Sequence, residues 1–148
     1  MILIILFPFL LVLTVTVHYG FLTRLMAILD TGWEQSIKLI AIICGLFVAH
    51  VVEVVVYAVV YYFAQLIPGV GELPGINYDG WVDILYFSFV AYSSLGAGDL
   101  SSLGWIKILY GLEAINGLVL ITWSASFSLL AMNRMHFCQP CSESSSTE

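Results

Sequence analysis

The sequence predicts an all-α membrane protein with three transmembrane helices and a fourth, shorter helix that enters the membrane and turns back. Hydrophobic residues make up 61% of the chain and charged residues 9%, and the mean hydropathy is +1.01. That composition cannot cover a water-exposed surface. Three apolar segments exceed the roughly 20 residues needed to cross a bilayer. A fourth, residues 81–93, measures only about 20 Å as a helix against a hydrocarbon core of about 30 Å.

The first predicted span covers residues 2–29 and contains Pro8, which favours a kink. It has no basic segment at its start and no small-residue cleavage site after it. We therefore interpret it as a retained helix rather than a signal peptide. Together with a short loop it forms a predicted N-terminal region, residues 1–35.

The remaining elements form one predicted pore-like domain, residues 36–134. It begins with an outer helix, 36–67, rich in Val, Ile and Tyr. The short helix, 81–93, runs into the polar, glycine-broken stretch "SSLGAGD", and a third span covers 105–133. Non-helical backbone at membrane depth must be enclosed by protein or reached by water, because unpaired amides cost several kcal/mol in hydrocarbon. This order of elements predicts a re-entrant loop. Residues 135–148 lose the hydrophobicity and are predicted to be a disordered tail.

The charged residues predict an orientation. Basic residues favour the cytoplasmic ends of spans. With three spans, the N-terminus is then expected outside and the C-terminus in the cytoplasm, most simply in the cell membrane. The residues assigned to the cytoplasmic side are Arg24, Lys38 and Arg134, those on the outer side are Glu72, Asp79, Asp83 and Asp99, and Lys107 is the exception.

The run "DILYFSFVAYSSLGAGDL", residues 83–100, resembles the pore helix and selectivity filter of the potassium-channel pore-loop superfamily, whose typical run is YFSFVTLTTVGYGD. Trp105 and Lys107 open the following helix, and Gly117 lies where this family often has a hinge glycine. The resemblance covers about residues 49–133. It implies a homotetramer in which each chain contributes one loop to a central cation pathway, with K⁺ or Na⁺ as the permeant ion and no cofactor.

The resemblance also assigns roles to particular residues. Backbone carbonyls of a filter replace an ion's hydration shell, and glycines permit the backbone angles this requires. The pore helix would cover 81–93, the filter 94–99 and the inner helix 105–133. By position the filter residues are Ser94, Leu95, Gly96, Ala97, Gly98 and Asp99, the hinge is Gly117, and the pore-lining residues are Leu118, Ile121, Ala125 and Leu129.

The filter differs from the family run in ways that leave the permeant ion open. Ala97 replaces the aromatic that braces the filter, Ser93 and Ser94 replace threonine, and Leu95 replaces valine. Potassium-selective and weakly selective cation conduction are both consistent with this. The alternative from another class is a non-conducting scaffold or accessory subunit with a degenerate filter. A small transporter using Glu53 and Glu113 is weaker, because no inverted repeat is visible.

Four polar residues within the predicted spans form two pairs, and such groups are costly at that depth and normally face protein or water. His50 and Glu53 share one face of the second span, and Glu113 and Asn116 share one face of the third. A 100° step per residue places the second pair away from the predicted pore line, so we expect it to meet the first. Three roles remain open: a structural network, a gating or proton-sensing site, and a cation site built from His and carboxylates.

Other classes of function find little support. No nucleophile with a base, phosphate-binding loop or cofactor motif is present, so the chain is not expected to be an enzyme. Four Lys and Arg residues against ten Asp and Glu argue against nucleic acid as a partner. Cys44 is expected in the core. His136, Cys138 and Cys141 lack the second ligand pair of a closed zinc site, and no resident metal is predicted. Ser124, Ser126 and Ser128 suit close helix packing.

Overall fold

A computed structural model describes residues 2–67, 80–96 and 104–137. These residues form four helices and no strand: α1 (Ile2–Leu29), α2 (Gln35–Gln65), α3 (Trp81–Tyr92) and α4 (Ile106–Phe137). α1, α2 and α4 are long and apolar enough to cross a membrane. The predicted all-α fold with three candidate spans is therefore confirmed.

The observed ends of the helices differ slightly from the predicted ones. α2 begins one residue earlier than predicted and ends two residues earlier, whereas α3 ends one residue earlier. α4 begins one residue later and continues to Phe137, into the segment predicted as a disordered tail. A helix can extend past the membrane, because its hydrogen bonds do not require apolar surroundings. Residues 138–148 of that segment lie outside the described residues.

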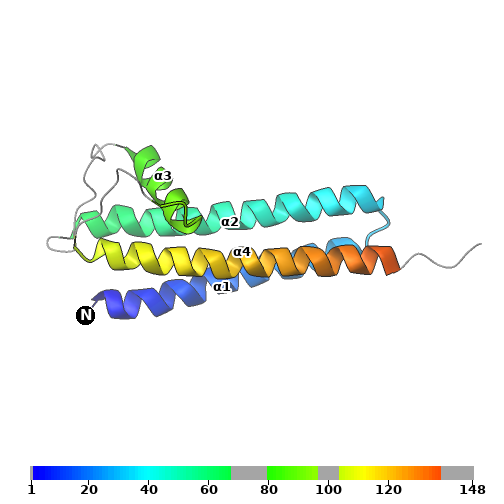
Figure 1. Cartoon of the computed structure of the whole chain (residues 1–148), viewed down its shortest axis with the longest axis horizontal. Helices are drawn as coiled ribbons and strands as arrows, with labels where there is room; N and C mark the ends of the chain where they lie inside the picture. Colours follow the sequence, from blue (N-terminus) through cyan, green and yellow to red (C-terminus); the bar gives the residue numbers. More distant parts are fainter. Residues whose placement is uncertain (1, 68–79, 97–103, 138–148) are drawn as a thin grey trace, which may run out of the picture.

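α1, α2 and α4 form an elongated bundle in which each helix contacts the other two (Figure 1). α2 runs antiparallel to α1 and α4. The short helix α3 packs on α2 and α4, on the side of the bundle away from α1, and its C-terminal end points toward the middle of the bundle (Figure 1). This end places residues 93–96 beside the central part of α4.

The bundle core consists of two apolar clusters. One joins α1, α2, α3 and the start of α4, and contains Leu10, Tyr57, Tyr61, Phe87 and Leu109 among others. The other joins α1, α2 and the C-terminal half of α4, and contains Leu22, Leu46 and Phe127 among others. On each long helix, buried polar side chains lie between the residues of the two clusters, for example His18 on α1. The polar residues are therefore enclosed in the interior.

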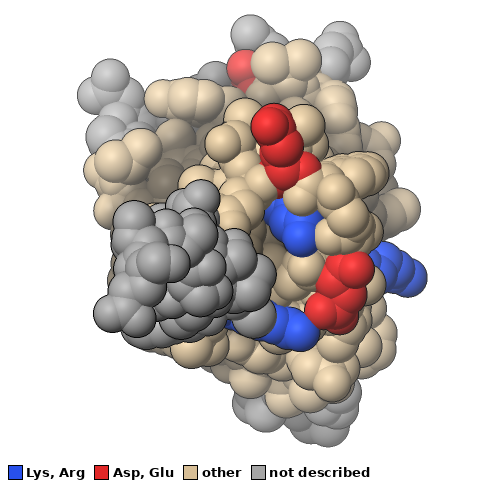
Figure 2. Space-filling view, turned by 90° about the vertical axis from the view of Figure 1, so that its right-hand side faces the viewer, with Lys and Arg blue, Asp and Glu red and all other residues tan. Residues whose placement is uncertain are grey.

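Charged side chains gather at the end of the bundle where α1 meets α2 and where α4 ends (Figure 2). Arg134 forms an exposed ion pair with Asp30 at 2.8 Å, and the Lys38 ammonium donates to the Leu29 carbonyl at 3.0 Å. Lys38, Arg134 and Asp30 line one shallow pocket there. The lysine thus satisfies a carbonyl that the end of α1 leaves without a helical partner.

Candidate functional site: a buried polar network beside the loop after α3

Buried polar side chains converge in the bundle from all four helices. Each lies in a span or in the short helix, where an unpaired polar group would be costly. The fully or almost fully buried ones are Thr14, His18, Glu53, Ser88, Glu113, Asn116 and Ser124. They form three groups of contacts at different levels of the bundle.

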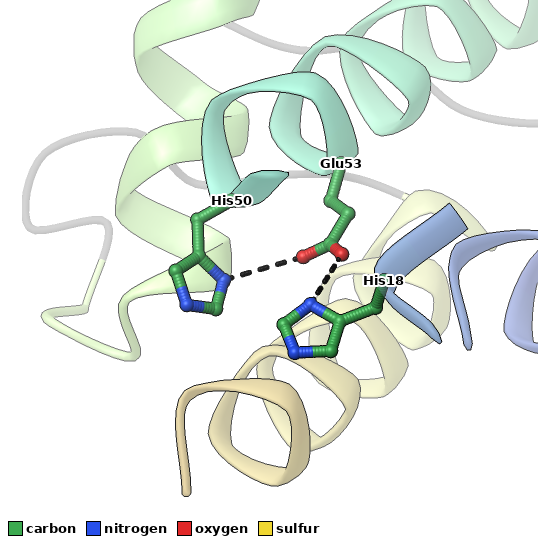
Figure 3. Close-up of side chains that lie close together, drawn as sticks. All are labelled: His18, His50 and Glu53. Atoms are coloured by element: carbon green, nitrogen blue, oxygen red, sulfur yellow. Dashed lines mark hydrogen bonds and ion pairs between the residues drawn. The ribbon is translucent and has the colours of Figure 1, made fainter. Parts of the chain in front are cut away.

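The first group is a closed ring of five side chains. His18 Nδ1 lies 2.8 Å from Glu53 Oε1, and the Tyr92 hydroxyl donates to Glu53 Oε2. His50 Nδ1 lies 2.8 Å from the Tyr92 hydroxyl and 3.3 Å from Glu53 Oε2. Ser124 Oγ lies 3.2 Å from His18 Nε2 and 3.0 Å from His50 Nε2, which closes the ring. Figure 3 shows both imidazoles approaching the Glu53 carboxylate.

The second group surrounds Glu113. The Tyr61 hydroxyl donates to its Oε2 at 2.5 Å, and the Ser88 hydroxyl donates to its Oε1 at 2.6 Å. The Val54 carbonyl oxygen, 2.9 Å from Ser88 Oγ, is a second acceptor for the serine. This group therefore ties α2, α3 and α4 together.

The third group joins α1 to the rest of the bundle. The Asn116 amide donates to Thr14 Oγ1 at 2.8 Å and to the Tyr57 hydroxyl at 3.0 Å. Thr14 in turn donates to the Leu10 carbonyl of its own helix at 2.9 Å. α1 is thus held by buried hydrogen bonds as well as by apolar contacts.

The predicted meeting of Glu113 and Asn116 with His50 and Glu53 is wrong. His50 and Glu53 do contact each other, as their shared helix face predicted. The residue of α4 that contacts His50 is Ser124, eleven positions beyond Glu113 and therefore about 16 Å further along the helix. The helical wheel correctly predicted that Glu113 and Asn116 point into the bundle. Which residues of α2 they meet depends on how far α4 is shifted along its axis relative to α2.

The loop after α3 begins with two residues in the left-handed region of backbone space. Ser94 has φ +56° and Gly96 has φ +85°. Glycine tolerates that region without strain, whereas a serine there is uncommon. Leu95 between them is 81% exposed. The other predicted filter residues, Ala97, Gly98 and Asp99, lie outside the described residues.

Gly117 lies where the end of α3 meets α4. A Cβ atom at this position would fall 2.2 Å from the Tyr92 carbonyl oxygen, which is closer than real Cβ atoms come to their neighbours. The absence of a side chain therefore lets α3 approach α4 directly beneath the loop. The structure gives this glycine a packing role, and its predicted role as a hinge stays a prediction.

The four predicted pore-lining residues share the exposed side of α4. Leu118, Ile121, Ala125 and Leu129 are all exposed in the single chain, whereas Asn116, Leu120 and Ser124 are buried. Apolar residues exposed in one chain of a membrane protein face lipid, another chain or a pore. The 100° step per residue thus correctly predicted that Glu113 and Asn116 are buried and that the four predicted pore-lining residues lie on a different side of the helix.

Sequence reasoning missed most partners of the predicted polar residues: His18, Tyr61, Ser88, Tyr92 and Ser124. His18 carried a usable signal, because it is an ionisable residue in the middle of an apolar span. Ser124 was expected only to suit close packing. Tyr61 lies eleven positions after His50 and therefore on the same face of the second span, whereas Tyr92 and Ser88 have no distinguishing feature in the sequence. Cys44, expected in the core, is exposed on the surface of α2.

A model of the protein family described as "Ion channel" matches residues 49–132 of the chain. This range contains the C-terminal half of α2, all of α3 and most of α4, and covers more than half of the sequence. No curated protein and no solved structure matches the chain.

Proposed function

This chain belongs to the pore-loop ion channel superfamily, and from that premise we propose that it conducts monovalent cations passively through the centre of a homotetramer. Ion channel function follows from the family, and the chain is an integral membrane protein. The tetramer, the filter and the permeant ion are our proposal. K⁺ is the expected ion, and Na⁺ passes as well if the filter is only weakly selective.

The observation that carries the proposal is the position of the loop after α3. α3 ends against Gly117 in the middle of α4, and the next residues, Ser93 to Gly96, include two in the left-handed region. A pore-loop filter requires a short helix ending near the membrane centre and backbone able to direct successive carbonyls toward an ion. We infer that α3 is the pore helix and residues 94–99 form the filter.

The faces of α4 support a central pore. Glu113, Asn116 and Ser124 are buried inside the chain, whereas the exposed side contains the apolar Leu118, Ile121 and Leu129 together with Thr122 and Ser126, whose hydroxyls bond within the helix. In a tetramer this side would border the axis and the neighbouring chains. The exposed side of α2, which includes Ile40, Phe47 and Val48, would then face lipid.

The basic residues at one end of the bundle support an orientation. Arg24, Lys38 and Arg134 lie at the membrane ends that the positive-inside rule assigns to the cytoplasm. We propose that the C-terminus is cytoplasmic, that the N-terminus is outside, and that the protein resides in the cell membrane.

Flux from purified protein tests the function. The full chain is reconstituted in liposomes after its mass in detergent has been measured, and K⁺, Rb⁺ and Na⁺ flux is recorded. Four chains per particle and cation flux above that of empty liposomes are expected. Verified tetramers without flux over a range of voltage and pH would instead favour the non-conducting scaffold.

Selectivity has its own test in Ala97→Tyr. If the missing aromatic makes the filter loosely braced, this substitution raises the ratio of K⁺ to Na⁺ flux. Unchanged flux ratios would contradict that explanation of selectivity while leaving conduction itself intact.

A further inference from the structure

Two imidazoles from different helices present the same nitrogen to one buried carboxylate. His18 of α1 and His50 of α2 both direct Nδ1 toward Glu53, at 2.8 and 3.3 Å from its two oxygens (Figure 3). One ligand atom from each of the three residues lies within 4.8 Å of the others. His18 and Glu53 are completely buried, and the side chain of His50 is 20% exposed. The cluster is therefore enclosed but reachable from the His50 side in the single chain.

The far sides of both imidazoles meet a single hydroxyl. Ser124 Oγ lies 3.2 Å from Nε2 of His18 and 3.0 Å from Nε2 of His50. A hydroxyl oxygen has two lone pairs and can accept hydrogen bonds from both rings. If Nδ1 of each ring binds a metal, Nε2 carries the hydrogen, and outer partners of this kind fix the orientation of metal-binding histidines. One serine thus supports both ligands.

With neutral imidazoles and an ionised carboxylate, the ring has one hydrogen too few for its contacts. It contains five contacts, from His18 to Glu53, Tyr92, His50, Ser124 and back to His18. With neutral imidazoles and an ionised carboxylate, the two histidines, Tyr92 and Ser124 supply one hydrogen each, four in all. A proton on one imidazole supplies the missing hydrogen, and a metal ion bound to both Nδ1 atoms and the carboxylate is the other way to compensate the buried negative charge.

We propose that His18, His50 and Glu53 form a binding site for one transition-metal ion of the Zn²⁺ class within each chain, with Tyr92 beside the fourth position. Two imidazoles and a carboxylate are a typical zinc ligand set, whereas Mg²⁺ and Ca²⁺ prefer oxygen ligands alone. Tetrahedral bonds of about 2.0–2.1 Å separate ligand atoms by about 3.3 Å. The two imidazole nitrogens lie 2.8 and 3.3 Å from different oxygens of Glu53, and one ligand atom from each residue lies within 4.8 Å of the others, so binding requires small side-chain movements.

A metal ion bound at this site would connect three helices, which is a role separate from cation conduction. His18 belongs to α1, and His50 and Glu53 belong to α2. Tyr92 is the last residue of α3 and directly precedes the loop proposed as the filter. The ion would hold the first helix to the pore domain and fix the end of the helix that supports the loop.

Zinc binding to the purified full chain tests the proposal. The background carries His136→Asn, Cys138→Ser and Cys141→Ser, because the tail offers other metal ligands. Zn²⁺ per chain is measured by equilibrium dialysis and elemental analysis in detergent. One Zn²⁺ per chain is expected, with affinity lowered more than about 100-fold in Glu53→Gln and in His18→Gln. Glu113→Gln, which alters another buried carboxylate without an imidazole partner, leaves the affinity unchanged.

A milder variant keeps the test decisive if those substitutions prevent folding. Ser124→Ala retains all three ligands and removes only their outer partner, so affinity should fall about 10- to 100-fold. Ser126→Ala, whose hydroxyl bonds only to the Thr122 carbonyl of its own helix, is the matched control. Co²⁺ provides a second readout, because a tetrahedral site gives it strong visible absorption. Bound Co²⁺ should also quench Trp123, whose ring lies 5.4 Å from that of His18.

Two results would overturn the metal site. One is the absence of stoichiometric Zn²⁺ and of the Co²⁺ spectrum in folded background protein, which would leave the ring as a proton-containing hydrogen-bond network. The other is an equal loss of affinity in Ser124→Ala and Ser126→Ala. Binding is measured without ion flux, so failure here leaves the channel proposal standing.

Discussion

Glu113 is completely buried in α4, and Tyr61 and Ser88 each donate a hydrogen bond to one of its carboxylate oxygens. A buried carboxyl group is costly unless it is hydrogen-bonded. Once it is paired, removing one partner destabilises the protein, because the other partner is left unsatisfied. Since Ser88 lies on α3 and Tyr61 on α2, the same carboxylate also determines how the short helix sits on the bundle.

Ser88→Ala should therefore destabilise the protein by about 1–3 kcal/mol, the usual cost of an unsatisfied buried acceptor. Ser126→Ala is a matched control, because Ser126 is exposed and bonds only within its own helix. Its effect should stay within about 0.5 kcal/mol. Unfolding in mixed detergent micelles measures both, and equal destabilisation of the two variants would contradict a special role for the Glu113 group.

At the scale of elements, the contact between α3 and α4 brings the loop to the middle of the bundle. It depends on Gly117, because the Tyr92 carbonyl occupies the space where a Cβ atom would lie. The same tyrosine enters the ring through its hydroxyl. Both ends of one residue thus fix the C-terminus of α3, through backbone contact with α4 and through a hydrogen bond to α2.

Gly117→Ala tests this contact, because helices normally prefer alanine to glycine and only the packing against Tyr92 opposes the substitution. Alanine in place of a helical glycine usually stabilises by about 1 kcal/mol. Forcing a methyl group into a packed contact costs about 1–3 kcal/mol, so we expect a lower melting temperature and reduced cation flux. Gly111→Ala, at a position of α4 with no atom within 4 Å of the added methyl, should keep or raise stability and retain flux. Improved stability in Gly117→Ala would contradict the packing role.

At the scale of the whole molecule, the polar residues of the network lie inside the chain, whereas many large apolar residues of the long helices are exposed. That distribution suits an assembly in which α4 borders a central pore and α2 borders lipid. α1 is part of the bundle rather than a loosely attached anchor, since Thr14 and His18 form buried hydrogen bonds to the other helices.

Cysteine accessibility distinguishes the two faces. In a background with Cys44, Cys138 and Cys141 replaced by Ser, Ala125→Cys should react with a charged thiol reagent from water and lose most of its flux. Phe47→Cys, on the exposed side of α2, should be protected by lipid and keep its flux. Protection of residue 125 together with reaction at residue 47 would reverse the proposed arrangement.

The helices and the direction of their faces could be predicted because both depend on local sequence. Apolar length determined the three candidate spans, and the 100° step correctly turned Glu113 and Asn116 inward and Leu118 and Leu129 outward. The partners of the inward residues could not be predicted, because they depend on the axial offset between helices distant in sequence. That offset places Ser124, rather than Glu113, beside His50.

The sequence by itself thus determined that the chain lies in a membrane, how many candidate spans it has and which ion channel family it belongs to. These follow from composition, from the length of the apolar segments and from the run around "SSLGAGD", which are all properties of the chain alone. Only the tertiary structure decided that His18, His50 and Glu53 form one cluster and that Tyr92 connects it to the loop. Packing brings together residues 35 and 39 positions apart, and no local pattern records which level of one helix meets which level of another.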